Sequence, residues 1–211
     1  MNAADINAIV GRLHEGILDG SLAVAGNASI GGDLDVIGAR TDAVEAATYG
    51  AGALSTAVAP KVQIRTVSGE IITTLKIDLT GLKSKSDVDD VIGVDGVAKA
   101  YFIRIVTATH GFVYRGEMSC IELPTASTNV GLDIDLASEG VDTGAYDTDG
   151  NGYTSIIAAG GNWALGLTKT FLQGPLANEY IYLLTGATHT GDSVYTGGQF
   201  IIKFYGHPVL T

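Results

Sequence analysis

The sequence contains a single cysteine and few charged residues, and both features limit what kind of protein it can be. Cys120 is the one cysteine in 211 residues, which excludes an intrachain disulfide and a thiolate metal cluster. Its neighbours read as a strand, and this predicts a small buried side chain at Cys120. Charged residues make up 17% of the chain and hydrophobic residues 46%, a balance typical of a compact fold with one main domain.

Basic residues are scarce relative to acidic ones. Lys and Arg number 12 against 23 Asp and Glu, which gives a net charge of −11. This charge repels phosphate backbones, and no Lys/Arg cluster with interleaved aromatic residues offsets it. We therefore expect no nucleic-acid partner.

Long hydrophobic runs are also missing. The charge-free apolar stretch near the middle, Tyr153 to Thr168, has 16 residues, whereas a membrane-spanning helix needs roughly 20. Asp5, Arg12 and Asp19 interrupt any apolar run near residue 1, so we expect no signal peptide, no membrane partner and a soluble protein made in the cytoplasm. Low surface charge in such a chain indicates surface that is buried against partner subunits, which favours an oligomer.

The segment from Ala4 to Asp19 has apolar residues at helical spacing, with Asp5 available as an N-cap. We predict one amphipathic docking helix. Its apolar stripe has to be buried on the same chain, on a copy of it or on another protein. The residues that form this stripe are Ile6, Ile9, Val10, Leu13 and Ile17.

Three six-residue repeats follow between residues 22 and 39. Each has apolar or small residues at its first and third positions and glycine at its fifth, namely Gly26, Gly32 and Gly38. Two residues on one face of an extended chain, followed by glycine, describe a short strand and a tight turn. Three steps are too few for a single-chain solenoid, but three identical chains would close a core around them. The predicted trimerisation residues are Leu22, Val24, Ile30, Leu34 and Val36.

The period and the glycine positions of residues 22–39 resemble the short β-spirals near the N-termini of bacteriophage fibre, appendage and capsid-decoration proteins. The resemblance covers about 18 residues. It implies a homotrimer that belongs to a virion. An ordinary hairpin or meander with the same spacing is the alternative.

Residues 40–60 are rich in Ala, Thr, Gly and Ser and are predicted to form a linker, and residues 61–211 a β-sandwich body. Val, Ile, Thr, Tyr and Phe with partial alternation predict about eight strands, and a jelly roll is one common arrangement of such a body. The segment from Ser84 to Gly96 is predicted to be a long loop. The expected strands are Val62–Val67, Glu70–Leu79, Lys99–Ala108, Gly111–Leu123, Val130–Leu136, Asn162–Leu172, Glu179–Thr185 and Val194–Tyr205.

Signatures of catalysis and of metal binding are missing from the sequence. It has no nucleophile elbow, no phosphate-binding glycine loop and no zinc-protease motif, and its four histidines are scattered. We therefore expect no catalytic residues, no metal ligands and no cofactor, and a non-enzymatic protein. A glycan-processing enzyme on the same scaffold is a third hypothesis, after two non-enzymatic ones.

The segment from Asp147 to Tyr153 matches the first half of a calcium loop, with oxygen ligands at positions 1, 3 and 5 and glycine at 6. Position 12, which should supply a bidentate carboxylate, is Ala158, so we predict a turn without calcium dependence. Asp133 and Asp135 alternate on one predicted strand and are expected to form a solvated face. Paired with Tyr146 and Tyr153, these and nearby acids could instead bind a sugar.

The order of helix, hexad spiral and β-sandwich looks like that of a phage capsid-decoration, or cement, protein. The resemblance implies a homotrimer on the outer capsid surface of a virion, with the major capsid protein as its partner. The alternative is a head or tail fibre, a host-attachment protein that binds a surface glycan.

Overall fold

The computed structural model describes residues 49–54, 59–128, 131–157, 161–187, 189 and 192–208. The predicted docking helix, with Ile6, Ile9, Val10, Leu13 and Ile17, lies outside these residues. So do the hexads, with Leu22, Val24, Ile30, Leu34 and Val36. Both stay predictions, and the structure described below is that of the body.

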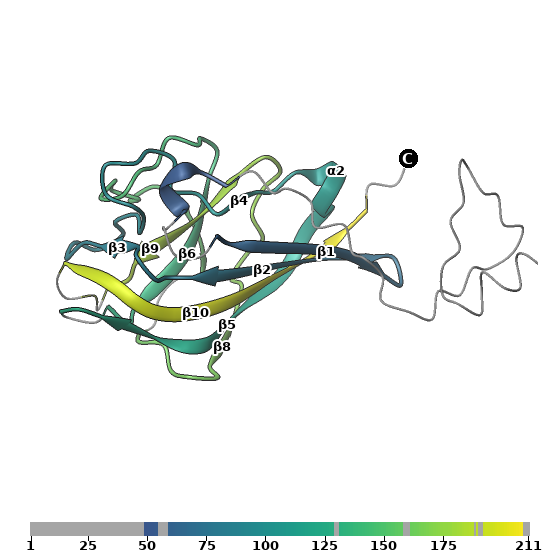
Figure 1. Cartoon of the computed structure of the whole chain (residues 1–211). Helices are drawn as coiled ribbons and strands as arrows, with labels where there is room; N and C mark the ends of the chain where they lie inside the picture. The colour runs from purple at the N-terminus through teal and green to yellow at the C-terminus, as the bar shows by residue number, and fades with distance from the viewer. Residues whose placement is uncertain are drawn as a thin grey trace, which may run out of the picture. The chain divides into compact units, whose positions relative to one another are not determined.

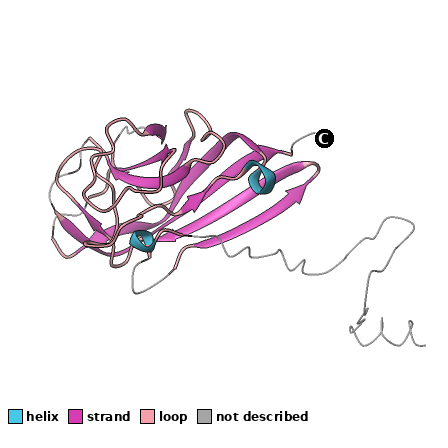
Figure 2. Ribbon diagram, turned by 90° about the horizontal axis from the view of Figure 1, so that it is seen from above, coloured by secondary structure: helices cyan, strands magenta, loops and turns pink. Residues whose placement is uncertain are grey.

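Strands joined by loops make up the body, and its regular secondary structure is almost all strand (Figure 2). Its two helical elements are single turns, and no helix among the described residues is long and apolar enough to cross a membrane. The elements in chain order are η1 (Ala51–Ala53), β1 (Lys61–Val67), β2 (Glu70–Asp78), β3 (Lys83–Ser84), β4 (Ile103–Arg104), α2 (Thr107–His110), β5 (Phe112–Ala126), β6 (Ile134–Glu139), β7 (Thr154–Ile157), β8 (Thr168–Thr170), β9 (Tyr180–Thr185) and β10 (Ser193–His207).

The strands form two antiparallel sheets (Figure 1). The larger sheet has the order β1-β2-β10-β5-β8, with β3 paired to β10, and the smaller sheet has the order β4-β9-β6-β7. Strands far apart in the chain are paired: β2 with β10, β4 with β9, and β5 with β8. Two pairs join strands that follow one another in the chain: β1 with β2, and β6 with β7.

The β1–β2 hairpin turns at Ser68 and Gly69, whose φ angles are both positive, at 50° and 81°. Val67 is paired with Glu70, so the turn has two residues. A two-residue turn with both φ angles positive matches the right-handed twist of the strands it joins, and glycine adopts this conformation without a Cβ clash. The turn sets the register of the whole hairpin.

One hydrophobic core joins the inner faces of the two sheets, an arrangement compatible with a β-sandwich. Leu75 of β2 and Phe200 of β10 contribute from the larger sheet, and Leu136 and Leu183 from the smaller one, all with no exposed surface. Trp163 is buried between them, with its ring 5.1 Å from that of Phe200 and its Nε1–H donating to the Ile134 carbonyl oxygen at 2.8 Å. The indole can therefore be buried without an unsatisfied donor.

Strands β1, β2, β5, β9 and β10 confirm five of the predicted strands to within a few residues. Cys120 is buried as predicted, and β10 lies inside the larger sheet between β2 and β5. In β10, Phe200, Ile202 and Phe204 face the core. Their content of Val, Ile, Thr, Tyr and Phe, with partial alternation, carried these predictions.

Three predicted strands are shorter or displaced, and two strands were missed. Of Lys99–Ala108 only Ile103–Arg104 is strand, of Asn162–Leu172 only Thr168–Thr170, and Val130–Leu136 is replaced by Ile134–Glu139. Strands β3, Lys83–Ser84, and β7, Thr154–Ile157, were not predicted. Residues 100–102 are buried irregular chain, whereas most of 162–172 is exposed, and a short apolar run does not distinguish such segments from strand.

Candidate functional site

A second layer of chain covers the outer face of the smaller sheet. Val91 and Ala100 pack with Ala137, Tyr182 and Leu184 in a separate buried cluster. The segment from Ser84 to Gly96, predicted as a long loop, has few strand residues. Its middle, residues 90–93, is buried and not solvated. This layer builds one side of the polar hollow described next.

Four tyrosines pack together in this layer. The ring centroids of Tyr101 and Tyr180 are 4.7 Å apart, and those of Tyr153 and Tyr182 are 5.2 Å apart. The Tyr182 hydroxyl donates to the Val141 carbonyl oxygen at 2.9 Å, and burial raises the pKa of this phenol. All four rings are at least partly buried, so they pack within the layer and do not form a flat exposed surface on which a sugar ring could stack.

The segment 147–153 is a turn that packs against this layer. The Asp149 carboxylate accepts from the backbone N–H of Asn151 at 2.8 Å, and the Gly150 N–H donates to the Asp89 carbonyl oxygen at 2.8 Å. A Cβ at Gly150 would lie 2.6 Å from that oxygen, so only glycine allows the close approach. The turn predicted from the sequence is therefore present, with an Asx turn at Asp149, and the 87–92 segment holds it.

A polar hollow of about 150 Å³ opens between this turn and strands β6 and β7. The hollow is lined by the carboxylates of Asp89 and Asp135, the amide of Asn151, the phenol of Tyr153 and the hydroxyl of Ser155. Such groups can donate to and accept from sugar hydroxyls. The hollow is smaller than the roughly 300 Å³ at which pockets begin to enclose drug-sized ligands, so it suits at most one ring.

Asp133 and Asp135 do not form the solvated face expected of them. Asp133 has no exposed surface and Asp135 is 7% exposed. The expectation was wrong because the outer face of this sheet is covered by other parts of the chain, which a period-2 pattern cannot reveal. Of the predicted sugar-binding set, Asp135 and Tyr153 do line one hollow, whereas Tyr146 does not.

The turn does not assemble a calcium site from its own acids. Asp149 accepts from Asn151, and an Oδ2 of Asp147 is 3.8 Å from Lys85 Nζ. Among the described residues, no group of three or more His, Cys, Asp or Glu is placed to hold a metal ion. We therefore expect the melting temperature to be the same with a calcium chelator and with millimolar calcium, as measured by calorimetry. A rise of several degrees with calcium would contradict this prediction.

Asp90 is the most unusual carboxylate of the layer. It is 6% exposed, its N–H donates to the Thr185 hydroxyl at 2.9 Å, and its Oδ2 has no hydrogen-bond partner among the described residues. Burial raises the pKa of Asp90, and the negative charges of Asp147, Asp87 and Asp149 raise it further, against a smaller lowering by Lys85. The folded state therefore disfavours the ionised form.

We expect Asp90→Asn to stabilise the protein at neutral pH but not in acid. A carboxyl whose folded pKa is raised contributes stability that is present below its unfolded pKa, about 3.9, and is lost as pH rises through the folded value. The melting temperature of the variant minus that of the wild type should thus increase with pH from about pH 4 upward. A pH-independent difference between the two curves would show that Asp90 is not the titrating group.

Exposed leucines follow the β8 edge of the larger sheet. We call Leu165, Leu167, Leu172 and Leu176 the leucine edge; Leu165, Leu172 and Leu176 are each 68 or 69% exposed. Their segment runs beside β5, since Cys120 N–H donates to the Leu167 oxygen and Phe171 N–H to the Gly116 oxygen, both at 2.9 Å. A groove of about 430 Å³ with Phe112 and Pro175 in its wall continues the apolar surface.

Comparisons with protein-family models, with curated proteins and with solved structures each find no match. Sequence reasoning named Asp135 and Tyr153 as sugar-binding candidates and Asn151 only as position 5 of a calcium loop. It missed Ser155 and the leucine edge. Asn151 and Ser155 flank Tyr153 in the sequence, so a search for polar residues around that turn would have found them. The exposure of the leucines had no such signal, because the same residues fit a buried strand.

Proposed function

We propose that this chain is a non-enzymatic structural protein of a virion, a trimeric decoration protein that binds the major capsid protein of an assembled shell. The observation that carries the proposal is the nested pairing of the strands. If β1 and β3 are set aside, eight strands remain in chain order. The first pairs with the last, the second with the seventh, the third with the sixth and the fourth with the fifth.

Nested pairing of eight antiparallel strands over two sheets is the arrangement of a jelly roll, which we propose for the body. Jelly rolls serve in viral capsid proteins and in lectins, and fold alone does not choose between such functions. The hexad pattern of residues 22–39 favours a trimer, and the docking helix predicted for residues 4–19 would offer an apolar stripe to a partner. The leucine edge adds the exposed apolar surface that a protein seated on a shell is expected to have.

Three-fold assembly explains how such a protein acts. A trimer engages several shell subunits at once, so modest individual contacts add through a high effective concentration. If the assembled shell is bound and free subunits are not, binding stabilises the shell by mass action. No bond-making chemistry is needed for this activity.

The location of the protein on a particle tests the proposal. Gold-labelled antibodies against residues 61–211 should decorate the shell in electron micrographs of virions that carry this protein. Purified protein should also sediment with empty shells. Label on a tail or fibre would reject the capsid role, and the absence of label from all virion parts would reject a structural role in the virion.

A host-attachment protein is the second candidate. The polar hollow with Asp135, Asn151, Tyr153 and Ser155 favours it, because sugar-binding sites place carboxylates and amides beside aromatic rings. Asp135→Ala and Ser155→Ala should then abolish binding to host cells while leaving shell sedimentation unchanged. Under the decoration proposal, neither substitution changes how much protein sits on the shell.

A further inference from the structure

The basic residues of the body fall into two groups. Five of the ten described lysines and arginines form ion pairs with carboxylates, and Arg104 and Lys169 have hydrogen bonds to Asn178 and to the Gly161 oxygen as well as aromatic contacts. Among the described residues, the three that form neither kind of contact are Lys61, Arg65 and Lys76. In a chain with 23 acidic residues, three unpaired cations on one hairpin are unexpected.

Lys61, Arg65 and Lys76 lie on the outer face of β1 and β2. Lys61 is directly opposite Lys76 in the ladder, and Leu75 and Ile77, which flank Lys76, point into the core. Like charges directly opposite each other destabilise a pair of strands. The hairpin thus places two lysines on one face at paired positions, and no ion pair joins either of them to a described carboxylate.

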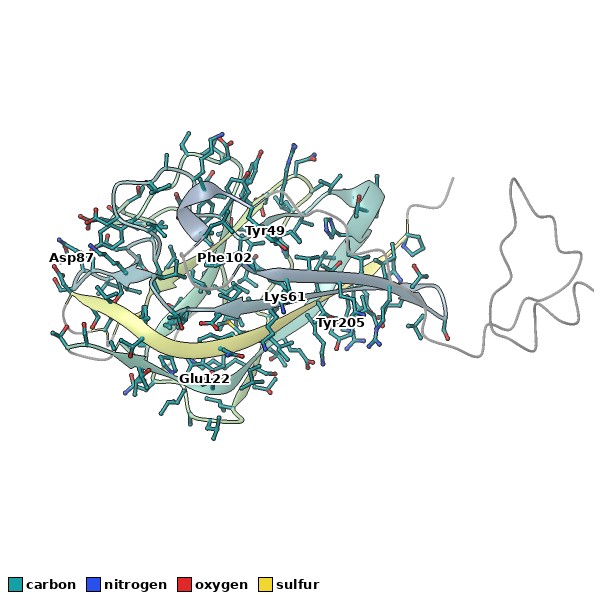
Figure 3. All side chains as sticks on the ribbon, in the orientation of Figure 1. Tyr49, Lys61, Asp87, Phe102, Glu122 and Tyr205 are labelled. Carbon is teal, nitrogen blue, oxygen red and sulfur yellow. The ribbon has the colours of Figure 1, made fainter. Side chains whose placement is uncertain are left out.

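A shallow hollow of about 230 Å³ lies at this lysine pair. Lys61, Lys76, Asp78, Gln199 and Ala59 line it. The ladder explains the grouping, because Lys76 is paired with Ile201 and Asp78 with Gln199 on the adjacent strand β10. Figure 3 labels Lys61 near the middle of the view and Asp87 at its left edge.

The lining of this hollow combines two kinds of polar group. Two cations can bind one carboxylate, while the Asp78 carboxylate and the Gln199 amide can bind hydroxyl groups. Gln199 Nε2 already approaches Asp78 Oδ2 at 3.4 Å, and Asp78 Oδ1 accepts from the Thr80 N–H at 2.9 Å. Asp78 is thereby held in place beside the lysines without forming an ion pair with them.

We propose that this hollow binds an acidic sugar of a polysaccharide, with its carboxylate on Lys61 and Lys76 and its hydroxyls on Asp78 and Gln199. Arg65 is on the same face, four residues along β1 or about 13 Å away, and meets a further carboxylate of the same polymer. Duplex DNA fits less well, because it has no free hydroxyl groups along its backbone to donate to Asp78, which would then only repel its phosphates. The site is distinct from the polar hollow at Tyr153 and does not rest on the capsid role.

Titration calorimetry with the full-length protein tests this site. The probes are polygalacturonate, alginate and hyaluronate, with dextran as a neutral polysaccharide and duplex DNA as a polyphosphate. We expect at least one of the three acidic polysaccharides to bind, and Lys61→Gln with Lys76→Gln to weaken that binding at least tenfold. The matched control, Lys83→Gln with Lys99→Gln, removes the same charge from exposed lysines elsewhere and should change the affinity less than twofold. The Lys61/Lys76 variant should melt no lower than the wild type, because it relieves a like-charge contact.

Asp78→Asn separates sugar recognition from simple charge attraction. The substitution removes a negative charge beside the lysines, so a site that only attracts anions would bind more tightly. A site that uses the Asp78 carboxylate to accept hydrogen bonds from sugar hydroxyls would bind more weakly, and we expect a loss of about fivefold or more. Tighter binding by Asp78→Asn, equal binding of DNA, equal losses in the two lysine pairs, or no binding of any of the three acidic polysaccharides would each overturn the proposal.

Discussion

Replacing Val24, Ile30 and Val36 together by aspartate is expected to convert the protein from a trimer to a monomer and to abolish its binding to shells. In the predicted spiral these side chains meet their copies at a three-fold core, where added carboxylates would lack partners and repel one another. Light scattering should give a mass three times 21.7 kDa for the wild type and 21.7 kDa for the variant. The β-type circular dichroism of the body should be retained in both.

The hexads supply a matched control for this experiment. Ala23 and Ser29 occupy second positions, where the third repeat already has Asp35. Ala23→Asp with Ser29→Asp should therefore leave the trimer intact, since these positions face outward in the predicted spiral. A wild-type protein that is monomeric or dimeric at micromolar concentration would refute the spiral itself.

Removing residues 1–39 tests whether these residues carry trimerisation and docking while the body folds by itself. If residues 61–211 hold their own core, the shortened protein should stay folded, lose the trimer mass and bind shells poorly. Undiminished shell binding would place docking on the body, for which the leucine edge is the exposed apolar surface.

Phe200→Ala is expected to produce the largest loss of stability among single core substitutions. Phe200 has no exposed surface and packs edge-on against Trp163 between the two sheets. Truncation of a buried phenylalanine costs about 3 to 5 kcal/mol of unfolding free energy, which for a body of this size lowers the melting temperature by about 6 to 20 °C. Calorimetry measures this directly.

Ile201 is the control for Phe200, one residue further along β10. It is half-buried on the outer face of the larger sheet, opposite Lys76 and Ser119. Ile201→Ala removes fewer contacts and leaves no internal cavity, so it should cost about 1 kcal/mol. Equal losses at the two positions would mean that the space between the sheets is not the main core.

Many of the strands could be predicted because strand content is a local property of the sequence. In β2 and β10 the β-branched and aromatic residues partly alternate with polar ones, and this pattern indicates strands with one face in a core. Ser68-Gly69 between two such strands indicates the hairpin. The turn from Asp147 to Tyr153 could be predicted for the same reason, because it depends on residues close together in the chain. So could the lack of a carboxylate at Ala158, position 12 of the calcium-loop pattern.

The candidate sites depended on contacts between distant parts of the chain. The sequence by itself determined a strand-rich body, the approximate bounds of five of its strands and the turn from Asp147 to Tyr153. Only the tertiary structure decided that Asp133 and Asp135 are buried, that Asp135 meets Asn151 and Tyr153, and that Lys61 and Lys76 lie together beside Gln199. The physical reason is that burial and charge pairing depend on which strands become neighbours. That choice is made by the packing of the whole core, because each strand on its own satisfies the same alternation in several registers.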